Sequence, residues 1–271
     1  MNIELPVART AFYCCIIRAD DAASPDPVCG DTYAKRFVTP EVRRDLAPAL
    51  QLSYPAATNV ARHRLIDDLV RDALKEHPQR RIILLGAGFD TRAYRLTGGR
   101  WTEMDDGPLL AFKEERLPRH ESPNPLERLP VTFASETPAQ FLAAVAGTDD
   151  AIVILEGVSM YLSDDAISGL ANALLRALPN ATLICDLMTA HFARTYSGKL
   201  RQVLEGLGAT FGERRVEADT LIEAAGYARV AVYSLPEMGR QYGKLRLPKW
   251  VLSTFLRGLR DGYRLWVFRR G

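Results

Sequence analysis

The chain has 271 residues, of which 47% are hydrophobic, and it carries a formal net charge of +2. This length and hydrophobic content suffice for one large domain with a complete core. Basic residues alternate with acidic ones rather than forming a run, which gives no electrostatic case for nucleic-acid binding. No apolar stretch reaches the roughly 18 residues of a membrane-spanning helix, and the first residues lack the pattern of a signal peptide.

The four cysteines predict neither a metal centre nor a disulfide framework. Cys14 and Cys15 are adjacent, and Cys29 and Cys185 stand apart from them. We therefore expect a reduced, cytoplasmic protein with buried thiols that binds neither nucleic acid nor a membrane. The sequence does not indicate the oligomeric state.

The first part of the chain is expected to form loops and short helices, because turn residues interrupt every apolar run up to about residue 55. A clearer helix is predicted over residues 60–76, where apolar residues recur at helical spacing. The next apolar run, Ile82 to Leu85, is unbroken, as in a parallel strand that helices cover on both faces.

Strands and helices then alternate along the chain. Strands are predicted at residues 100–105, 129–135, 151–157 and 181–188, with intervening helices at 107–120, 137–147 and from Ser163 to about Pro179. Alternation of this kind predicts an α/β fold with a doubly wound parallel sheet.

The C-terminal part departs from this alternation. A helix at 217–227 leads to a strand at 228–235, and the chain closes with an alternating strand at 263–270. Since no clear crossover helix separates them, we expect an antiparallel edge pair on a Rossmann-like, seven-stranded sheet with a helical cap. The expected single domain comprises a cap segment (1–58), a cofactor-binding core (59–234), a lid insertion (235–262) and the final strand (263–271).

The most specific stretch is RIILLGAGFDTRAYRL, in which the first strand runs into Gly86 and Gly88. Glycines at this point allow a tight turn and close approach of a ligand to the backbone. Thr91 stands where a dinucleotide fingerprint has its third glycine, and the carboxylate of Asp90 would repel a pyrophosphate. NAD and FAD are therefore disfavoured, and the Gly-Lys-Ser/Thr of a P-loop is absent.

Acidic residues downstream indicate a nucleoside ligand without phosphates. Glu103 and Asp105 lie 17 and 19 positions after Gly86, near the spacing at which an acid binds ribose hydroxyls. Glu156 ends the apolar run of the fourth strand, where it either binds a ligand or caps the neighbouring backbone. S-adenosylmethionine fits these features, because carboxylates favour its cationic sulfonium and ammonium groups.

The carboxylate of this cofactor requires a cation, and the helix before the first strand offers two. Arg62 shares the inward face with Ile66 and Leu69, whereas Arg64 lies on the solvated face. An arginine on an apolar stripe requires a partner, which is either the cofactor or a structural ion pair.

Taken together, "RIILLGAGFDTRAYRL", "WTEMDDGPLLAFKEERL" and "LEGVSMYLSDDA", with "ARHRLIDD" upstream, resemble the leucine carboxyl methyltransferase-like family. This is a branch of the class I S-adenosylmethionine-dependent methyltransferases, and its bacterial members include O-methyltransferases of polyketide and related natural-product biosynthesis. The resemblance implies that Arg62 binds the cofactor carboxylate and that Gly86 and Gly88 bind its methionyl backbone. It also implies that Asp105 binds the ribose hydroxyls, with Glu103 in support.

By the same resemblance, Glu156 lies at the methionyl amino group or the sulfonium, and Asp90 braces the glycine loop. Met160 and Tyr161 would line the boundary between cofactor and substrate. The family usually carries an Asp-Leu pair after the third strand, whose acid holds the adenine amino group. This chain has Ala134 and Ser135 there, so Ser135 or the adjacent Glu136 is expected to substitute.

These residues predict an S-adenosylmethionine-dependent O-methyltransferase that acts on a carboxylate or phenol of a small natural-product or polyketide-like acid, without a metal. A carboxylate needs no base, whereas a phenol with a pKa near 10 would benefit from one. His191, after the fifth strand, is the one histidine placed for that role, unless it is a surface residue. Tyr161 or Tyr196 could position a substrate oxygen.

The substrate pocket is expected from the N-terminal segment and the insertion 235–262. In the insertion Trp250 and Phe255 stand among basic residues, as in a lid or in an amphipathic helix packed on the body. Two other functions remain open. The altered adenine segment would suit a non-catalytic sensor or partner protein that binds S-adenosylmethionine, and a dehydrogenase is opposed by Asp90 and Thr91.

Overall fold

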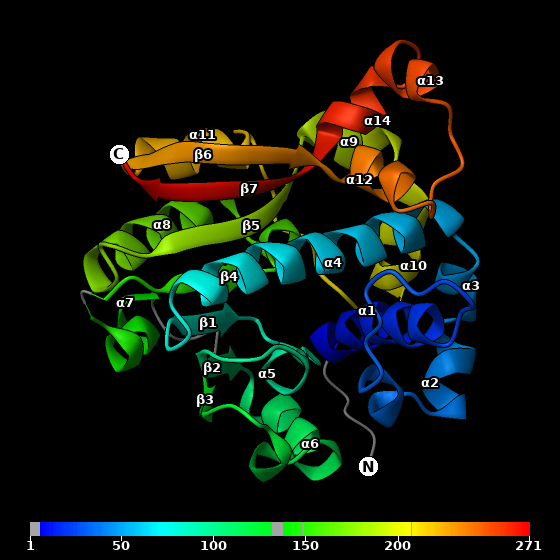
Figure 1. Cartoon of the computed structure of the whole chain (residues 1–271). Helices are drawn as coiled ribbons and strands as arrows, with labels where there is room; N and C mark the ends of the chain where they lie inside the picture. The colour runs from blue at the N-terminus through cyan, green and yellow to red at the C-terminus, as the bar shows by residue number, and fades with distance from the viewer. Residues whose placement is uncertain (1–5, 132–137, 148, 207) are drawn as a thin grey trace.

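A computed structural model describes residues 6–131, 138–147, 149–206 and 208–271 (Figure 1). It contains one seven-stranded sheet, with the strands in the order β3-β2-β1-β4-β5-β7-β6. The strands are β1 (Arg81–Leu85), β2 (Arg100–Asp105), β3 (Leu126–Pro130), β4 (Ile152–Leu155), β5 (Thr182–Met188), β6 (Tyr227–Ser234) and β7 (Tyr263–Arg270). The doubly wound, Rossmann-like α/β fold is thereby confirmed.

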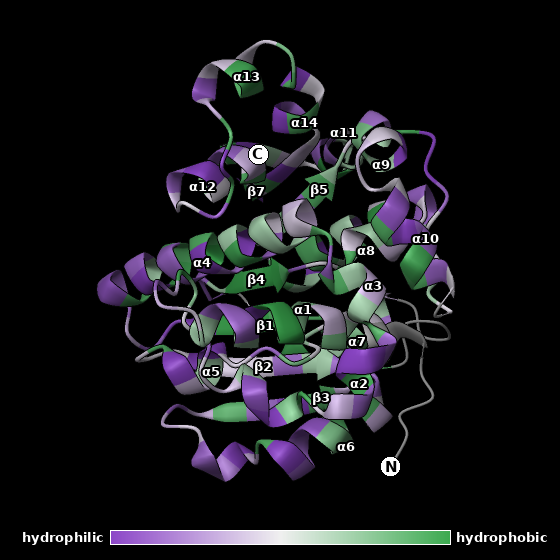
Figure 2. Ribbon diagram, turned by 90° about the vertical axis from the view of Figure 1, so that its right-hand side faces the viewer, coloured by the Kyte–Doolittle hydropathy of each residue, from purple (hydrophilic) through white to green (hydrophobic). Residues whose placement is uncertain are grey.

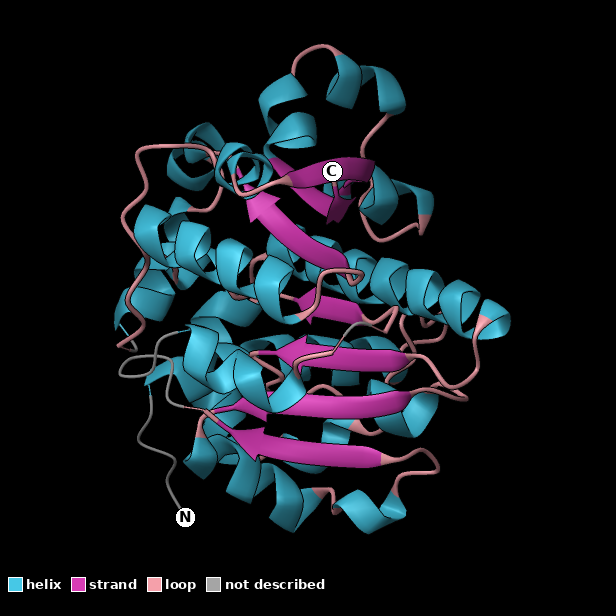
Figure 3. Cartoon of the chain, turned by 90° about the vertical axis from the view of Figure 1, so that its left-hand side faces the viewer, coloured by secondary structure: helices cyan, strands magenta, loops and turns pink. Residues whose placement is uncertain are grey.

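The first five strands run parallel, and β7 inserts antiparallel between β5 and β6 (Figure 3). The predicted antiparallel pair at the C-terminal edge is therefore confirmed, as are the bounds predicted for β2 and β7. β3 begins earlier than the predicted 129–135, at Leu126, and its described part ends at Pro130; residues 132–135 of the predicted strand lie outside the described residues. It is the edge strand, and its polar Glu127 and Arg128 hid it from a search for apolar runs.

The helices among the described residues cover both faces of the sheet. The α-helices are α1 (Pro6–Ala22), α2 (Pro40–Asp45), α3 (Ala47–Leu50), α4 (Ser53–Glu76), α5 (Arg92–Arg95), α6 (Gly107–Arg116), α7 (Pro138–Leu142), α8 (Asp164–Ala177), α9 (Ala190–Thr195), α10 (Gly198–Gly206), α11 (Ala218–Ala224), α12 (Leu235–Gln241), α13 (Lys249–Ser253) and α14 (Arg257–Gly262). Short 3-10 helices are η1 (Ala34–Phe37), η2 (Arg119–Glu121), η3 (Ala143–Val145) and η4 (Ser159–Tyr161). No helix of the described residues is long and apolar enough to cross a membrane.

Alternate residues of the central strands belong to two separate cores. Ile82 and Leu84 of β1 pack in the core that contains α1 and α4, whereas Ile83 and Leu85 pack against α7, α8 and α11. Because successive side chains of a strand point to opposite faces, a strand covered on both faces must be apolar throughout. Figure 2 shows this as continuous green on β1 and β4.

Two segments differ from the expected layout. The N-terminal segment contains a 17-residue helix, α1, which packs against α4, and α4 itself begins at Ser53 rather than residue 60. The insertion 235–262 folds into α12, α13 and α14, of which α13 projects from the body (Figure 1). Its Trp250 and Phe255 are 61% and 78% exposed.

Candidate functional site

A cavity of about 380 Å³ opens at the carboxyl ends of β1, β2, β4 and β5. Ligands of open α/β sheets bind at this edge because the loops that follow the strands converge there. The described residues that line the cavity come from α1, the start of α4, the loops after those four strands, and α9 and α10. The N-terminal segment lines it as predicted. Residues 235–262 do not, and α9 and α10 stand where the lid was expected.

The glycine loop forms one wall of the cavity. Gly86 and Gly88 have φ values of 70° and 46°, a left-handed conformation that favours glycine. A Cβ on Gly86 would lie 2.5 Å from Cγ2 of Val158, so the loop after β4 also requires a glycine here. The loop therefore brings its backbone, rather than side chains, to the cavity.

Asp105, at the end of β2, forms a hydrogen bond with the backbone of this loop. Its Oδ2 accepts a hydrogen bond from the Gly88 amide at 2.6 Å, and its Oδ1 accepts one from the Asp106 amide at 2.8 Å. The carboxyl group is buried and lines the cavity, and burial raises its pKa to about 6. Asp105 thus lines the cavity, and its contact with ribose hydroxyls stays a prediction.

Glu103 does not lie at the cavity, contrary to the role expected for it. Its carboxylate is fully buried between Lys113 Nζ at 2.9 Å and Arg128 Nε at 2.8 Å. Both partners come from elements that pack around β2, namely α6 and β3. The carboxylate of Glu103 is therefore neutralised by these two ion pairs. Distance along the sequence from the glycine loop could not show whether Glu103 or Asp105 faces the cavity.

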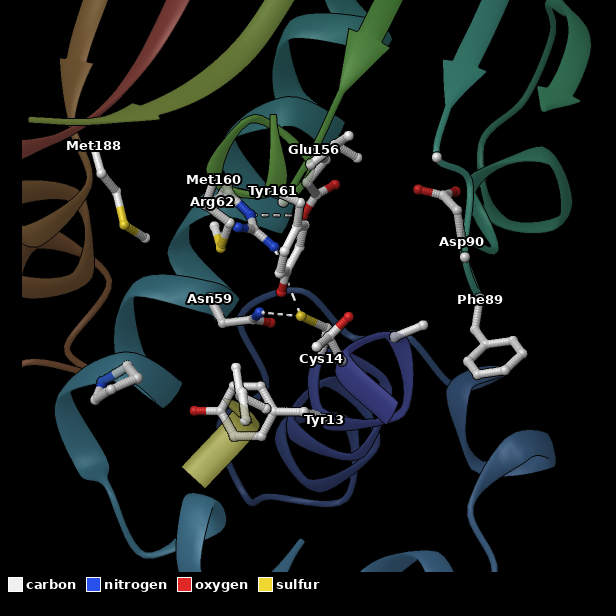
Figure 4. A pocket seen from close by; sticks show the side chains of 18 of the residues that line it. Tyr13, Cys14, Asn59, Arg62, Phe89, Asp90, Glu156, Met160, Tyr161 and Met188 are labelled. Carbon is white, nitrogen blue, oxygen red and sulfur yellow. Dashed lines mark hydrogen bonds and ion pairs between the residues drawn. The ribbon is translucent and has the colours of Figure 1, made fainter. Parts of the chain in front are cut away.

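Arg62 faces inward from α4, as its phase on the helix predicted, and is 4% exposed. Nε donates to Glu156 Oε1 at 3.0 Å (Figure 4). Nη1 donates to Asp186 Oδ2 at 3.0 Å and to the Tyr263 hydroxyl at 2.6 Å. The side chain also lines the cavity. The structural ion pairs of Arg62 are therefore present, and its contact with the cofactor carboxylate stays a prediction, whereas Arg64 pairs with Asp68 on the outer face.

A fully buried arginine that the sequence did not single out, Arg92, holds the other side of Glu156. Its Nη1 donates to Glu156 Oε2 at 2.8 Å and also to Asp90, and its Nε donates to Asp67 at 2.6 Å. Burial raises the pKa of Glu156, but the neighbouring Arg92, His63 and Arg62 side chains together outweigh burial and hold that pKa well below its usual range. Asp90 also accepts from the Arg92 amide at 2.7 Å, which braces the glycine loop.

These contacts belong to one buried charge network. Its members are four arginines and five carboxylates: Arg18, Arg62, Arg92, Arg95, Asp31, Asp67, Asp90, Glu156 and Asp186. His63 lies among them, and burial together with the Arg92 guanidinium lowers its pKa, so the ring is neutral at pH 7. The buried members thus carry one more negative than positive charge, although the partly exposed Arg71 also pairs with Asp67. Asp105 and Asp106 add acids to the cavity lining, and this excess of acids favours a cationic ligand.

His63, Asp90 and Glu156 offer ligand atoms within 4.8 Å of one another, as a metal site would. The guanidinium of Arg92 contacts all three side chains. A cationic side chain already occupies the position that a metal ion would take between them.

The wall opposite the glycine loop is largely apolar, with scattered polar groups. Tyr161, from η4, projects between Arg62 and Cys14, as Figure 4 shows. The hydroxyls of Tyr13 and Tyr54 have no hydrogen-bond partner among the described residues. Burial raises the pKa of both Tyr13 and Tyr161, so these phenols stay protonated at neutral pH.

One expected residue, His191, does not contribute to this wall, and another lies outside the described residues. His191 is exposed on α9 and does not line the cavity, because the helix turns Phe192 and Tyr196, one turn apart, toward it instead. His191 instead contacts Tyr196, with ring centroids 6.0 Å apart. Ser135, expected near adenine, lies outside the described residues.

Comparison with known proteins connects this site to a family. Residues 11–175 match the family model described as leucine carboxyl methyltransferase. A protein of Mycolicibacterium smegmatis, assigned to the S-adenosyl-L-methionine-dependent methyltransferases, is 31% identical over 183 residues, which cover 61% of this chain and 61% of the relative. The chain thus matches about three fifths of that relative's length.

Two further comparisons cover more of the chain. The tetracenomycin polyketide synthesis O-methyltransferase TcmP of Streptomyces glaucescens is 25% identical over 201 residues, which are 72% of this chain and 70% of TcmP. The crystal structure of a DUF574 family protein from Streptomyces avermitilis aligns with a TM-score of 0.58 at 15% identity, covering 95% of this chain and 97% of that one. The structural likeness shows a shared fold.

Proposed function

The chain belongs to the leucine carboxyl methyltransferase family, and on that premise we propose that it is an S-adenosylmethionine-dependent O-methyltransferase. We propose further that the methyl acceptor is a carboxylate of a small acid with an apolar body. The proposal rests on one contrast within the cavity. The wall at the glycine loop is net negative and suits the cationic cofactor, whereas the opposite wall is apolar and offers no base.

The site fits S-adenosylmethionine, which when bound supplies an electrophilic methyl group on a positively charged sulfur. The left-handed glycine loop leaves its backbone open to the methionyl part, and Asp105 stands at the end of β2 for the ribose hydroxyls. Glu156 would face the amino group or sulfonium, and Arg62, already held by Glu156 and Asp186, would face the carboxylate. The excess of buried carboxylates in the network offsets the cofactor's positive charge.

The acceptor side supports a carboxylate rather than a phenol. The described residues that line the cavity include no histidine and no lysine. Tyr13 and Tyr161 stay protonated, so they can donate hydrogen bonds to an oxygen but cannot remove its proton. A carboxylate is ionised at neutral pH and requires no proton removal, so the chain has only to hold the oxygen in line and exclude water.

The rest of that wall suits an apolar body. Met160, Met188, Phe192, Leu200 and Leu204 line the cavity beyond Tyr161. Methionines adapt to irregular apolar shapes, and small-molecule sites of this kind combine apolar walls with few polar groups. The relation to TcmP, itself an O-methyltransferase of polyketide synthesis, supports an aromatic or polyketide-like acid.

Methyl-labelled S-adenosylmethionine tests this proposal directly. The purified protein is incubated with aromatic acids and with phenols matched in size, and products are separated and treated with mild alkali. We expect label in methyl esters, which alkali hydrolyses to methanol, and little label in the alkali-stable ethers of phenols. Ether products would contradict the carboxylate assignment.

The same assay separates the enzyme from a sensor. A protein that binds the cofactor, measured by calorimetry, yet labels no acid or phenol in the panel would favour the non-catalytic role. A rise in melting temperature with NADH but not with S-adenosylmethionine would overturn the cofactor as well.

A further inference from the structure

A second, smaller chamber adjoins the cavity on the side away from the glycine loop. Its volume is about 150 Å³. It shares five lining residues with the main cavity: Met160, Met188, Ser197, Leu200 and Leu204. Phe211 in this chamber contacts Tyr161 of the main cavity, with ring centroids 5.2 Å apart. The two spaces therefore lie side by side, separated only by side chains that line both, and together match the length of an elongated ligand.

The chamber contains a cation without a partner. Arg214 forms no ion pair and no hydrogen bond with any described residue, and its Nη1 is buried. Glu217, the one acid that lines the chamber, instead accepts from the Ala190 amide at 3.1 Å and 3.2 Å. Burial lowers the pKa of Arg214, because the attraction of Glu217, Asp164 and Asp186 together does not offset it. A desolvated guanidinium of this kind is stabilised by an oxyanion.

The other two arginines of the chamber differ from Arg214. Arg201 pairs with Glu205 at 2.7 Å and lies over the ring of Phe211. Arg194 is exposed to solvent. Arg214 is thus the half-buried, unneutralised member of the three, and the chamber as a whole is net positive.

The backbone that carries Arg214 is fixed on both sides. The Gly212 amide donates to the Met160 carbonyl at 3.1 Å, and the Arg215 amide donates to Asp164 Oδ2 at 2.9 Å. A Cβ on Gly212 would lie 2.2 Å from the Leu162 carbonyl oxygen, so the segment packs directly on the loop that carries Tyr161. The backbone of Arg214 is therefore fixed relative to the acceptor wall, which reduces the part of the entropy cost of anion binding that comes from ordering the chain.

We propose that this chamber, defined by Arg214, Phe211 and Glu217, binds a second oxyanion of the methyl acceptor. The acceptor is then an elongated apolar acid with its reacting carboxylate in the main cavity and a distal carboxylate or phosphate on Arg214. The proposal rests on the carboxylate methyltransferase function and adds the substrate class. Arg214 is the specificity-determining residue.

Binding measurements test the subsite independently of turnover. The intact protein, with and without S-adenosylhomocysteine, is titrated calorimetrically with biphenyl dicarboxylate and biphenyl monocarboxylate, with suberate and octanoate, and with an acid that carries a terminal phosphonate. We expect each dianion to bind about tenfold to hundredfold more tightly than its matched monoanion. The carboxylate and phosphonate arms distinguish the two sources of the oxyanion.

Three variants assign the preference to Arg214. Arg214→Gln is expected to abolish the dianion preference while leaving monoanion affinity unchanged, and Arg214→Lys to retain most of it. Arg215→Gln, its exposed neighbour, is the matched control and should keep the preference. Equal affinity for dianions and monoanions in the unaltered protein, or an equal loss for both in Arg214→Gln, would overturn the proposal.

Methyl transfer measured in parallel keeps the two proposals apart. A dianion preference without any labelled product would leave the subsite standing and refute the methyltransferase activity. Labelled esters of monoacids without a dianion preference would do the reverse. The comparison of ligands on the unaltered protein stands even if Arg214→Gln does not fold.

Discussion

The cavity wall around Glu156 and the chamber wall around Arg214 both contain arginines and carboxylates. The arginines around Glu156 form ion pairs, whereas Arg214 forms none with a described residue. Around Glu156, the described arginines and carboxylates form one network in which Arg62 and Arg92 each contact two or more acids. Around Arg214, the nearest acids are bound to backbone amides instead.

This difference separates two uses of buried charge. A paired network keeps its geometry whether or not a ligand is present, because each charge already has a partner. An unpaired buried cation is costly until an anion arrives, so it favours binding of that anion. The first wall therefore suits the proposed cofactor in a preformed geometry, and the second is the proposed site of selectivity.

The largest contrast in stability is expected when one arginine is replaced in each of the two walls. Arg92→Met leaves Asp67, Asp90 and Glu156 without their shared partner, and we expect a loss of about 3–5 kcal/mol in the free energy of unfolding. Arg214→Met strands no acid, and its loss should stay below about 1 kcal/mol. Urea unfolding measures both. Similar losses would show that the two walls do not differ in pairing.

Arg62 and Arg64 sharpen the comparison within α4. Arg62→Ala should weaken S-adenosylhomocysteine binding about tenfold to hundredfold, because a charge-assisted contact to the carboxylate is lost. Arg64→Ala, on the outer face, should change the affinity less than about twofold. Calorimetry on the folded variants gives both values. Equal losses would refute the assignment of the inner face to the cofactor.

Asp105 gives the cofactor wall a pH dependence. Its folded pKa of about 6 is raised above the unfolded value, so the native state holds the extra proton between about pH 4 and pH 6. Stability from this group is present below about pH 4 and falls as pH rises through 6, by about 1.4 kcal/mol per pH unit at most. Asp105→Asn should remove this slope in thermal or urea unfolding across that range.

Cofactor binding should follow the opposite course. If ionised Asp105 accepts from ribose hydroxyls, S-adenosylhomocysteine binds more tightly as pH rises toward 6, by up to about tenfold per unit. The plateau lies above 6, and Asp105→Asn should flatten the profile. An unchanged profile in the variant would assign the dependence to another group.

The smallest effect is expected on the projecting helix α13. Trp250→Ser should leave the acceptor KM unchanged and shift stability by no more than about 0.5 kcal/mol, because the side chain is exposed and far from the lining residues. Leu200→Ala, on α10 between the cavity and the chamber, should raise that KM. Steady-state kinetics compare them, and a raised KM for Trp250→Ser would return the insertion to the role of a lid.

Much of this protein follows from local patterns. Unbroken apolar runs predicted the central strands, because a strand buried on both faces has apolar residues at every position. Alternation of apolar and polar residues predicted β7. The same reasoning turned Arg62 inward on α4, since helical phase depends on neighbours three and four positions away. The glycine loop and the family motifs then indicated the cofactor.

Contacts between side chains that are far apart in the sequence could not be predicted from such patterns. Asp105 and Glu103 share one face of β2. Asp105 accepts a hydrogen bond from the glycine loop, whereas Glu103 forms ion pairs with Lys113 and Arg128. His191 follows the fifth strand as expected, but the phase of α9 turns it to solvent. A strand pattern fixes which face a side chain occupies, whereas its contacts depend on neighbouring elements.

The buried network makes the same point at longer range. Arg92 meets Asp67 and Glu156, which lie 25 and 64 positions away in the chain. Arg214 differs from the other arginines of the chamber because it is half-buried and no described acid pairs with it, and the positions of residues along the sequence cannot reveal a missing partner. Periodicity records burial, and burial determined the fold and the inward arginine. Which charges are neutralised, and which remain for a ligand, was decided only when α4, α5, β4 and the segment after α10 came together.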